Sequence, residues 1–277
     1  MKEIVLDSKS IVKDIKYQIS RKKEKQDCVF LFLDNKEKIT VPIDRYFEFG
    51  LKDINCLNQE IYDSLKREER LYLGYISCLR KLSIKDYSIK QVSDYLKNNK
   101  KLYIDEINAI INKLINYGLL DDDKYCQSRV PYLNKQLLSN KQIKLKLIKE
   151  GINSELIDKY VINNSEEEYR KAYLLANKYS SLSKKKSINA FKQNILSKLV
   201  NAGYSYDDSK SAIENLDIKN DNELTLLKKE YLKAKNKYEK KYEDYDLKKH
   251  IYSYLLNKGF KSCDINKVME EQNGKAS

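Results

Sequence analysis

The sequence predicts a mainly α-helical protein, in which tandem three-helix repeats form an elongated, curved solenoid behind a small N-terminal antiparallel β meander. First, the 277 residues include only 7 glycines and 2 prolines, too few for the many tight turns of a β sandwich or barrel. Second, a leucine-anchored pattern recurs roughly every 50 residues, a period typical of helical repeat proteins. Third, the first segment alternates apolar and polar residues, as half-buried strands do.

The N-terminal segment is expected to form three strands. Apolar residues alternate from position 11 to 19, and a dense apolar run at 28–33 is followed, across a turn at 34–37, by a second run at 39–43. Pro42 suits the end of its strand, because proline cannot donate a ladder hydrogen bond. So small a sheet needs a helix to cover its apolar face. We therefore assign residues 1–56 to the meander and residues 57–86 to a connecting helix.

Four leucines anchor the repeat. Each has a β-branched residue four positions before it, and the last three have a glycine four positions after it. An i, i+4 pair lies on one face of a helix and predicts an inward-facing seam. Glycine just beyond fits the helix C′ position, which needs a positive φ. The repeat residues are Val92 and Leu96; Ile143, Leu147 and Gly151; Ile195, Leu199 and Gly203; and Ile251, Leu255 and Gly259. The predicted repeats span 87–138, 139–188 and 189–245, with a partial fourth at 246–277.

Capping residues mark the expected helix ends. Gly118 and Leu119 precede three consecutive aspartates at 121–123, and Tyr125 follows. Three neighbouring carboxylates on one helix start point in different directions and cannot converge on a metal ion without other ligands. A C-cap glycine, Gly118, followed by an N-capping aspartate is the simpler interpretation, and the helix dipole favours the acidic residues Asp121 and Asp122 at the helix start.

Polar residues at other helix starts support the same division. Asn153 and Ser205 stand two residues beyond a repeat glycine and can N-cap the next helix. Ser165 and Glu168 have the S-x-x-E spacing of a capping box. Each repeat is thus expected to hold three short helices.

The charge is strongly basic and unevenly distributed. The chain carries a net charge of +13 with a pI near 9.2, and the first 70 residues are nearly neutral. The later part is therefore the candidate for contact with phosphates or an acidic protein surface. Only 7 of the 54 basic residues are arginine, which disfavours bidentate base recognition and favours backbone-directed contacts. The stretch at 141–149 has the least acidic compensation.

The sequence offers no catalytic, cofactor or metal site. Five cysteines are widely spread and a single histidine accompanies them, so neither a zinc site nor a redox motif is indicated. No glycine-rich nucleotide-binding loop and no nucleophile elbow is present. No stretch approaches the ~18 apolar residues of a membrane span. We expect a cytoplasmic monomer that contacts no membrane.

Two runs resemble the RecX family of regulators of the RecA recombinase. They are 87–96 and 118–125, and the segment 141–152 is similar to the family's second helical repeat. The similarity covers roughly residues 85–215, and the N-terminal β extension and fourth repeat resemble the longer form of the family. Family members commonly have arginine just before the serine of the first repeat, where this chain has Tyr87 before Ser88.

The resemblance implies a non-enzymatic protein that lodges along the groove of the RecA–single-stranded-DNA filament. It would modulate, and mainly inhibit, ATP hydrolysis, strand exchange and co-protease activity in homologous recombination, DNA repair and the SOS response. The RecA filament would be the partner, with single-stranded DNA contacted indirectly or weakly. The predicted contact residues are Lys90, Arg129, Lys135, Lys141, Lys144 and Lys149. The alternative is a free-standing, backbone-directed DNA-binding protein whose three-helix units act like helix-turn-helix modules.

Overall fold

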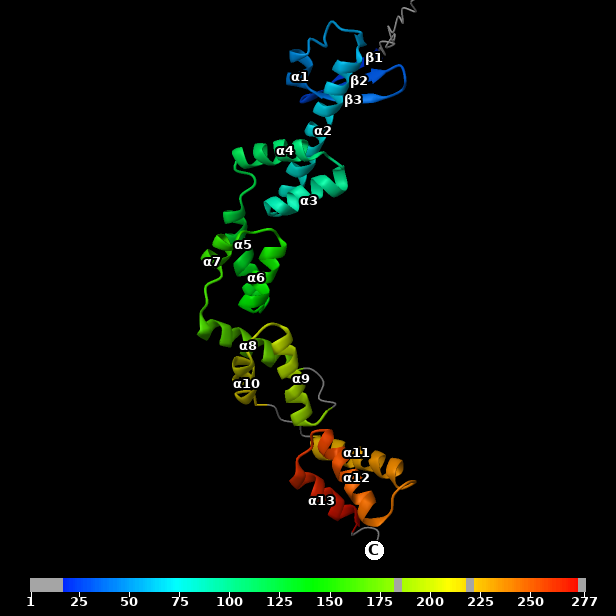
Figure 1. The fold of residues 1–277 in the computed structure, drawn as a ribbon, viewed down its shortest axis with the longest axis vertical. Coiled ribbons are helices and arrows are strands. Elements are labelled where there is room, and N and C mark those ends of the chain that lie inside the picture. Colours follow the sequence, from blue (N-terminus) through cyan, green and yellow to red (C-terminus); the bar gives the residue numbers. More distant parts are fainter. Residues whose placement is uncertain (1–16, 182–185, 218–221, 274–277) are drawn as a thin grey trace, which may run out of the picture. The chain divides into compact units, whose positions relative to one another are not determined.

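A computed structural model describes residues 17–181, 186–217 and 222–273. It confirms a mainly helical chain with a small antiparallel sheet near the N-terminus (Figure 1). The chain divides after Tyr125 into two compact units. The first part of the predicted strand face, at positions 11 to 16, lies outside the described residues. None of the helices within the described ranges is long and apolar enough to cross a membrane.

Three strands of the sheet lie in the segment predicted to form strands, and a fourth, of two residues, was not predicted. It contains β1 (Tyr17–Glu24), β2 (Cys28–Leu33), β3 (Lys38–Pro42) and β4 (Cys56–Leu57), in the order β3-β2-β1-β4. The hairpin between β2 and β3 uses the predicted turn at 34–37, with Lys36 at a φ of 67°. Pro42 ends β3, as expected.

One face of the sheet is buried under the helices and loops of the first unit. Val29, Leu31 and Val41 are fully buried on that face. α1 (Ile43–Glu48) and the start of α2 (Gln59–Leu82) complete this core. Glu69 of α2 also protects the sheet edge, since its Oε1 accepts the backbone N–H of Thr40 in β3 at 2.6 Å. An edge strand with a bonded N–H is a poorer template for pairing with other chains.

Eleven further helices follow α2 in the described residues. They are α3 (Ile89–Lys100), α4 (Ile104–Asn116), α5 (Asp122–Lys135), α6 (Asn140–Lys149), α7 (Ser154–Tyr160), α8 (Ser165–Ser180), α9 (Ile188–Asn201), α10 (Tyr206–Glu214), α11 (Glu223–Tyr238), α12 (Asp244–Asn257) and α13 (Ser262–Asn273). The four anchor leucines lie on α3, α6, α9 and α12, and all are fully buried. The repeat glycines have positive φ, as their predicted C′ role requires.

The hydrophobic clusters group the helices one helix earlier than the predicted repeat boundaries. Ala172 and Leu175 of α8 share a core with Ile195 and Leu199 of α9 and with α10. In the same way α11 shares a core with α12 and α13, and the end of α2 with α3 and α4. The boundaries at 139–188 and 189–245 had placed α8 and α11 with the preceding helices. The spacing of the leucines gives the length of a repeat but not the helix at which it starts. The starting helix depends on which neighbouring helices each apolar face packs against in the folded chain.

Most predicted caps are present. Asp121 Oδ1 accepts the backbone N–H of Asp123 at 2.9 Å, and Asp122 Oδ1 accepts that of Ile89 at 2.9 Å. The acidic run thus caps two helices, and within the described residues no three acidic, histidine or cysteine side chains form a possible metal site. Asn153 and Ser205 cap α7 and α10, as expected.

The capping box predicted for Ser165 and Glu168 is wrong. Asn164 is the N-cap of α8, and its Oδ1 accepts the backbone N–H groups of Glu166 and Glu167. Ser165 is therefore the first residue of the helix rather than its cap, and the Glu168 side chain accepts the backbone N–H of Asn140 instead.

Candidate partner-binding surface

Helix α6 has one face in the core and another in solvent. Ser139 caps it, with Oγ accepting the backbone N–H of Gln142 at 3.3 Å. The solvent-facing side carries two apolar side chains, Leu145 and Ile148, which are 51% and 60% exposed. Two exposed apolar side chains one helix turn apart, flanked by lysines, make this side of α6 a candidate contact surface.

An exposed apolar residue recurs at the same repeat position in three helices. The residue just after the anchor leucine is Ile148 in α6, Val200 in α9 and Leu256 in α12, and each is at least 41% exposed. The corresponding residue of α3 is Lys97. These three side chains, together with Leu145, are called the repeat-face residues below. Leu119, predicted as a repeat residue, is also 45% exposed.

The predicted contact lysines of α6 surround these apolar side chains in sequence. Lys141 and Lys149 are exposed. Lys144 is partly buried, and its Nζ lies 2.8 Å from Asp158 Oδ1 of α7. The exposed lysines give the apolar surface a basic border. The ion pair of Lys144 holds α7 against α6, so this residue has a structural partner as well as a predicted contact role.

The other predicted contact residues have different surroundings. Arg129 of α5 forms a two-point ion pair with Glu150, and its Nε–Oε2 distance is 3.3 Å. Lys135, in the last turn of α5, is exposed. Lys90 lies on α3 in the first unit and forms an i, i+4 pair with Asp94 at 3.2 Å. Of the predicted contact residues, Lys135 and the α6 lysines therefore lie in the second unit and Lys90 lies in the first, whereas Arg129 is engaged in an ion pair.

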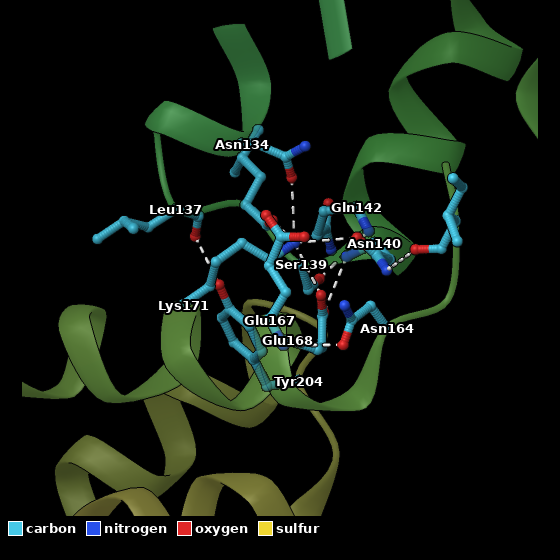
Figure 2. A network of polar contacts seen from close by, with 12 residues as sticks. Asn134, Leu137, Ser139, Asn140, Gln142, Asn164, Glu167, Glu168, Lys171 and Tyr204 are labelled. Atoms are coloured by element: carbon cyan, nitrogen blue, oxygen red, sulfur yellow. Dashed lines mark hydrogen bonds and ion pairs between the residues drawn. The ribbon is translucent and has the colours of Figure 1, made fainter. Parts of the chain in front are cut away.

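A buried lysine missed by the sequence analysis organises the start of α6 (Figure 2). The Lys171 side chain of α8 is only 7% exposed. Its Nζ donates to Asn134 Oδ1 at 3.1 Å, to the Leu138 carbonyl at 3.1 Å and to Asn140 Oδ1 at 2.9 Å. It also forms an ion pair with Glu168 at 2.7 Å. A buried cation must be fully paired to be tolerated, and Lys171 is.

The same network fixes the loop between α5 and α6. Glu168 Oε1 accepts the backbone N–H of Asn140 at 2.9 Å, and the Tyr204 hydroxyl donates to the Leu137 carbonyl at 2.8 Å. Burial raises the pKa of Tyr204, so its hydroxyl stays a donor at neutral pH. Figure 2 shows these side chains converging on the loop from α8 and from the chain after α9. These contacts orient α6 relative to α8, so we assign them a role in stabilising the fold.

A second set of contacts joins successive repeats. The Ser139 hydroxyl donates to the Ala202 carbonyl at 2.7 Å, and the Ser187 hydroxyl donates to the Lys258 carbonyl at 2.6 Å. Each serine caps one repeat helix and binds the end of the next. The repeat helices α6, α9 and α12 are therefore joined by equivalent hydrogen bonds. This regular linkage sets three of the repeat-face residues, Ile148, Val200 and Leu256, at equivalent positions of successive repeats.

Comparison with known proteins identifies relatives over nearly the whole chain. The sequence model of the third three-helix domain of RecX matches residues 221–269, which include α11 and α12 and most of α13. Regulatory protein RecX of Streptococcus gordonii is 30% identical over 263 residues, covering 92% of this chain and 99% of that protein. The protein of the same name from Streptococcus sanguinis gives the same identity and coverage. A crystal structure of a regulatory protein RecX aligns with 72% of this chain and 98% of its own, at 21% identity and a TM-score of 0.54.

Proposed function

Because the chain belongs to the RecX family of non-enzymatic regulators, we propose that it binds the RecA–single-stranded-DNA filament. In this proposal the bound protein inhibits the filament's ATPase, strand-exchange and co-protease activities. The proposed function therefore depends on the contacts that this chain makes with the filament.

The recurrence of the repeat-face residues is the observation that carries the proposal. Ile148, Val200 and Leu256 occupy the same position in three successive repeats, and all are exposed. A filament presents identical sites at regular intervals. Equivalent contacts on successive subunits raise one another's effective concentration, so several weak contacts produce tight binding.

The charge around α6 supports the same partner. Lys141 and Lys149 border the apolar side chains of Leu145 and Ile148. Lysine meets carboxylates and phosphates as a point charge, and a filament containing DNA and protein offers both. A free-standing helix-turn-helix function fits less well, because exposed leucine and isoleucine side chains gain little from a phosphate backbone.

The first experiment titrates the purified chain into a RecA ATPase assay with single-stranded DNA. We expect the rate to fall at fewer than one regulator per RecA protomer, since one bound molecule contacts several protomers. An unchanged rate at a molar excess of the chain would refute the proposal. Tight, sequence-selective duplex binding at physiological salt would favour the helix-turn-helix alternative instead.

A charge-reversal pair then tests the α6 surface. The double variant Lys141→Glu, Lys149→Glu should weaken inhibition about tenfold or more, because two like charges replace two attractive ones at the interface. The control Lys178→Glu, Lys210→Glu changes the net charge equally at two other exposed lysines of this unit. Equal inhibition by both folded double variants would show that α6 is not the contact surface.

A further inference from the structure

The outer face of the N-terminal sheet carries two aromatic side chains that the core does not use. Along β2, Val29, Leu31 and Leu33 are buried in the core, whereas Phe30 and Phe32 alternate with them on the opposite face. Both phenylalanines are only partly buried. Two large aromatic rings side by side on the open face of a sheet contribute little to the core and are available to a ligand.

Basic residues of the neighbouring strands flank these rings. On β1, Lys23 is the register partner of Phe30 and Arg21 that of Phe32. On β3, Lys38 is the register partner of Phe32. Directly opposed residues in an antiparallel sheet share one face. The outer face therefore places a row of cations on each side of two aromatic rings.

The cations approach the rings closely. The Arg21 guanidinium carbon lies 4.3 Å from the centre of the Phe32 ring. The Nζ of Lys38 lies 4.5 Å from the Phe30 ring centre, and that of Lys25 lies 5.2 Å from it. Such cation–π contacts hold the charged groups over the rings, and on an exposed surface each contributes only a modest stabilising free energy. The ring faces and the charges thus form one continuous surface.

No acidic partner neutralises this surface within the part of the chain that the structure describes. The cations of the outer face form no ion pair with another described residue; they are Arg21, Lys23, Lys25, Lys36 and Lys38. Nearby acids lie on the other side: Glu24 is the register partner of the inward-facing Val29, and Glu37 binds Tyr62 of α2 at 2.8 Å. Asp34 is the one carboxylate that lines the shallow hollow beside Phe32.

The charge of the first 70 residues is nearly zero when summed along the sequence. The sheet separates part of that charge by face: Glu24 has inward register and Glu37 binds Tyr62 of α2, whereas Arg21, Lys23 and Lys38 have outward register. Like charges gathered without partners repel one another, at a cost to stability. A bound polyanion would remove that repulsion.

From this arrangement we propose that the outer face of the β1–β2–β3 sheet binds single-stranded nucleic acid. Bases stack on Phe30 and Phe32 in place of the cations that lie over the rings in the free chain, and Arg21, Lys23 and Lys38 contact the phosphates on either side. Aromatic rings on a sheet face, bordered by a positively charged path, hold unpaired bases in this way. A duplex hides its base faces, so it satisfies the charges but not the rings. The proposal concerns the chain alone and does not depend on the filament function.

The test measures fluorescence anisotropy of a labelled 20-nucleotide oligothymidylate with the full-length chain and no recombinase. We expect binding that weakens with salt, as phosphate contacts require. The variant Arg21→Glu, Lys38→Glu should lose about tenfold or more in affinity. Its control is Lys52→Glu, Lys97→Glu, which changes the net charge equally at two exposed lysines of the same unit and should lose less than about threefold.

A second variant tests the rings separately. Phe32→Leu keeps an apolar side chain and the fold but removes the stacking surface, and it should lower affinity about fivefold or more, whereas Phe32→Tyr should retain it. Equal affinity of Phe32→Leu and wild type would overturn the stacking proposal. Equal losses in the two charge-reversal variants would overturn the proposed location.

Three competitors distinguish the kind of ligand. Unlabelled oligouridylate of equal length tests whether the face binds RNA as well as DNA, and its displacement of the labelled oligothymidylate would support a site for single-stranded nucleic acid. Displacement by a duplex or by poly-L-glutamate at the same phosphate or carboxylate concentration would show that the face recognises charge alone, which would overturn the proposal. Because recombinase is absent, loss of oligonucleotide binding and loss of filament regulation are separate results.

Discussion

Replacing Gly203 by alanine tests how successive repeats are joined. Gly203 has a φ of +88°, and a Cβ there would lie 2.6 Å from Ser139 Oγ. That hydroxyl donates to the Ala202 carbonyl at 2.7 Å and caps α6. Alanine therefore meets two obstacles, a backbone conformation unfavourable to L-residues and a hydroxyl group in its place.

The two obstacles can be given separate magnitudes. The left-handed conformation costs roughly 1–2 kcal/mol for a residue with a Cβ. Displacing the serine hydroxyl loses its hydrogen bond and its cap, about 1–2 kcal/mol more. We expect Gly203→Ala to lower the free energy of unfolding by about 2–4 kcal/mol. Gly118→Ala is the control, because Gly118 has a φ of +66° and a Cβ added there would have no other atom within 4 Å, so this variant should cost only about 1–2 kcal/mol.

The assay is urea unfolding followed by far-ultraviolet circular dichroism, applied to a double-mutant cycle. Ser139→Ala alone should cost about 1–2 kcal/mol through the lost cap. In the double variant Ser139→Ala, Gly203→Ala the hydroxyl is already absent, so the added Cβ displaces nothing. The double variant should therefore lose about 1–2 kcal/mol less unfolding free energy than the sum of the losses in the two single variants. Additivity within about 0.5 kcal/mol would refute the close contact between these residues.

Other variants test the buried and ionised groups. Lys171→Met should destabilise the second unit by about 3–5 kcal/mol in urea unfolding, because it leaves a buried carboxylate unpaired; an effect below about 1 kcal/mol would contradict the described network. The Lys233 ammonium and the Tyr254 hydroxyl hold the pKa of Glu230 below its usual 4.5, so its contribution is present above pH 4.5 and is lost as the pH falls through the lowered pKa; Glu230→Gln should flatten this part of the stability–pH curve, and an unchanged curve would count against the pairing. Burial raises the pKa of the Cys78 thiol to about 11, so in the folded protein at pH 8 iodoacetamide should alkylate exposed Cys56 and Cys263 first, and equal rates by mass spectrometry would exclude that burial.

The repeat was predictable from the sequence because its signals are local. Leu96 and Val92 lie four residues apart on one helix face, and both are buried. The glycine that follows each later repeat helix has the positive φ that its position predicts. The assignment of the first helix in each repeat was not predictable from spacing, because Ala172 packs against Ile195 through contacts formed only in the folded chain.

The missed features depend on residues distant in sequence. Glu168 has capping-box spacing, yet it binds Asn140 and Lys171 because Asn164 occupies the cap. No local pattern indicates the role of Lys171, because Asn134, Leu138 and Asn140, which accept its hydrogen bonds, lie 31 to 37 residues earlier in the chain. The basic outer face of the sheet was missed for a related reason. The net charge of a segment adds residues from both faces of a strand, whereas in the sheet the cations beside Phe30 lie on one face.

Hydroxyl-radical footprinting of the chain on the RecA–single-stranded-DNA filament tests directly whether the repeat-face residues bind the filament. We predict that Leu145, Ile148, Val200 and Leu256 lose reactivity together when the filament is added. Exposed Leu224 and Leu232 of α11, which are not repeat-face residues, should keep theirs. Unchanged reactivity of the repeat-face residues on a filament that the chain binds and inhibits would show that these residues do not contact it.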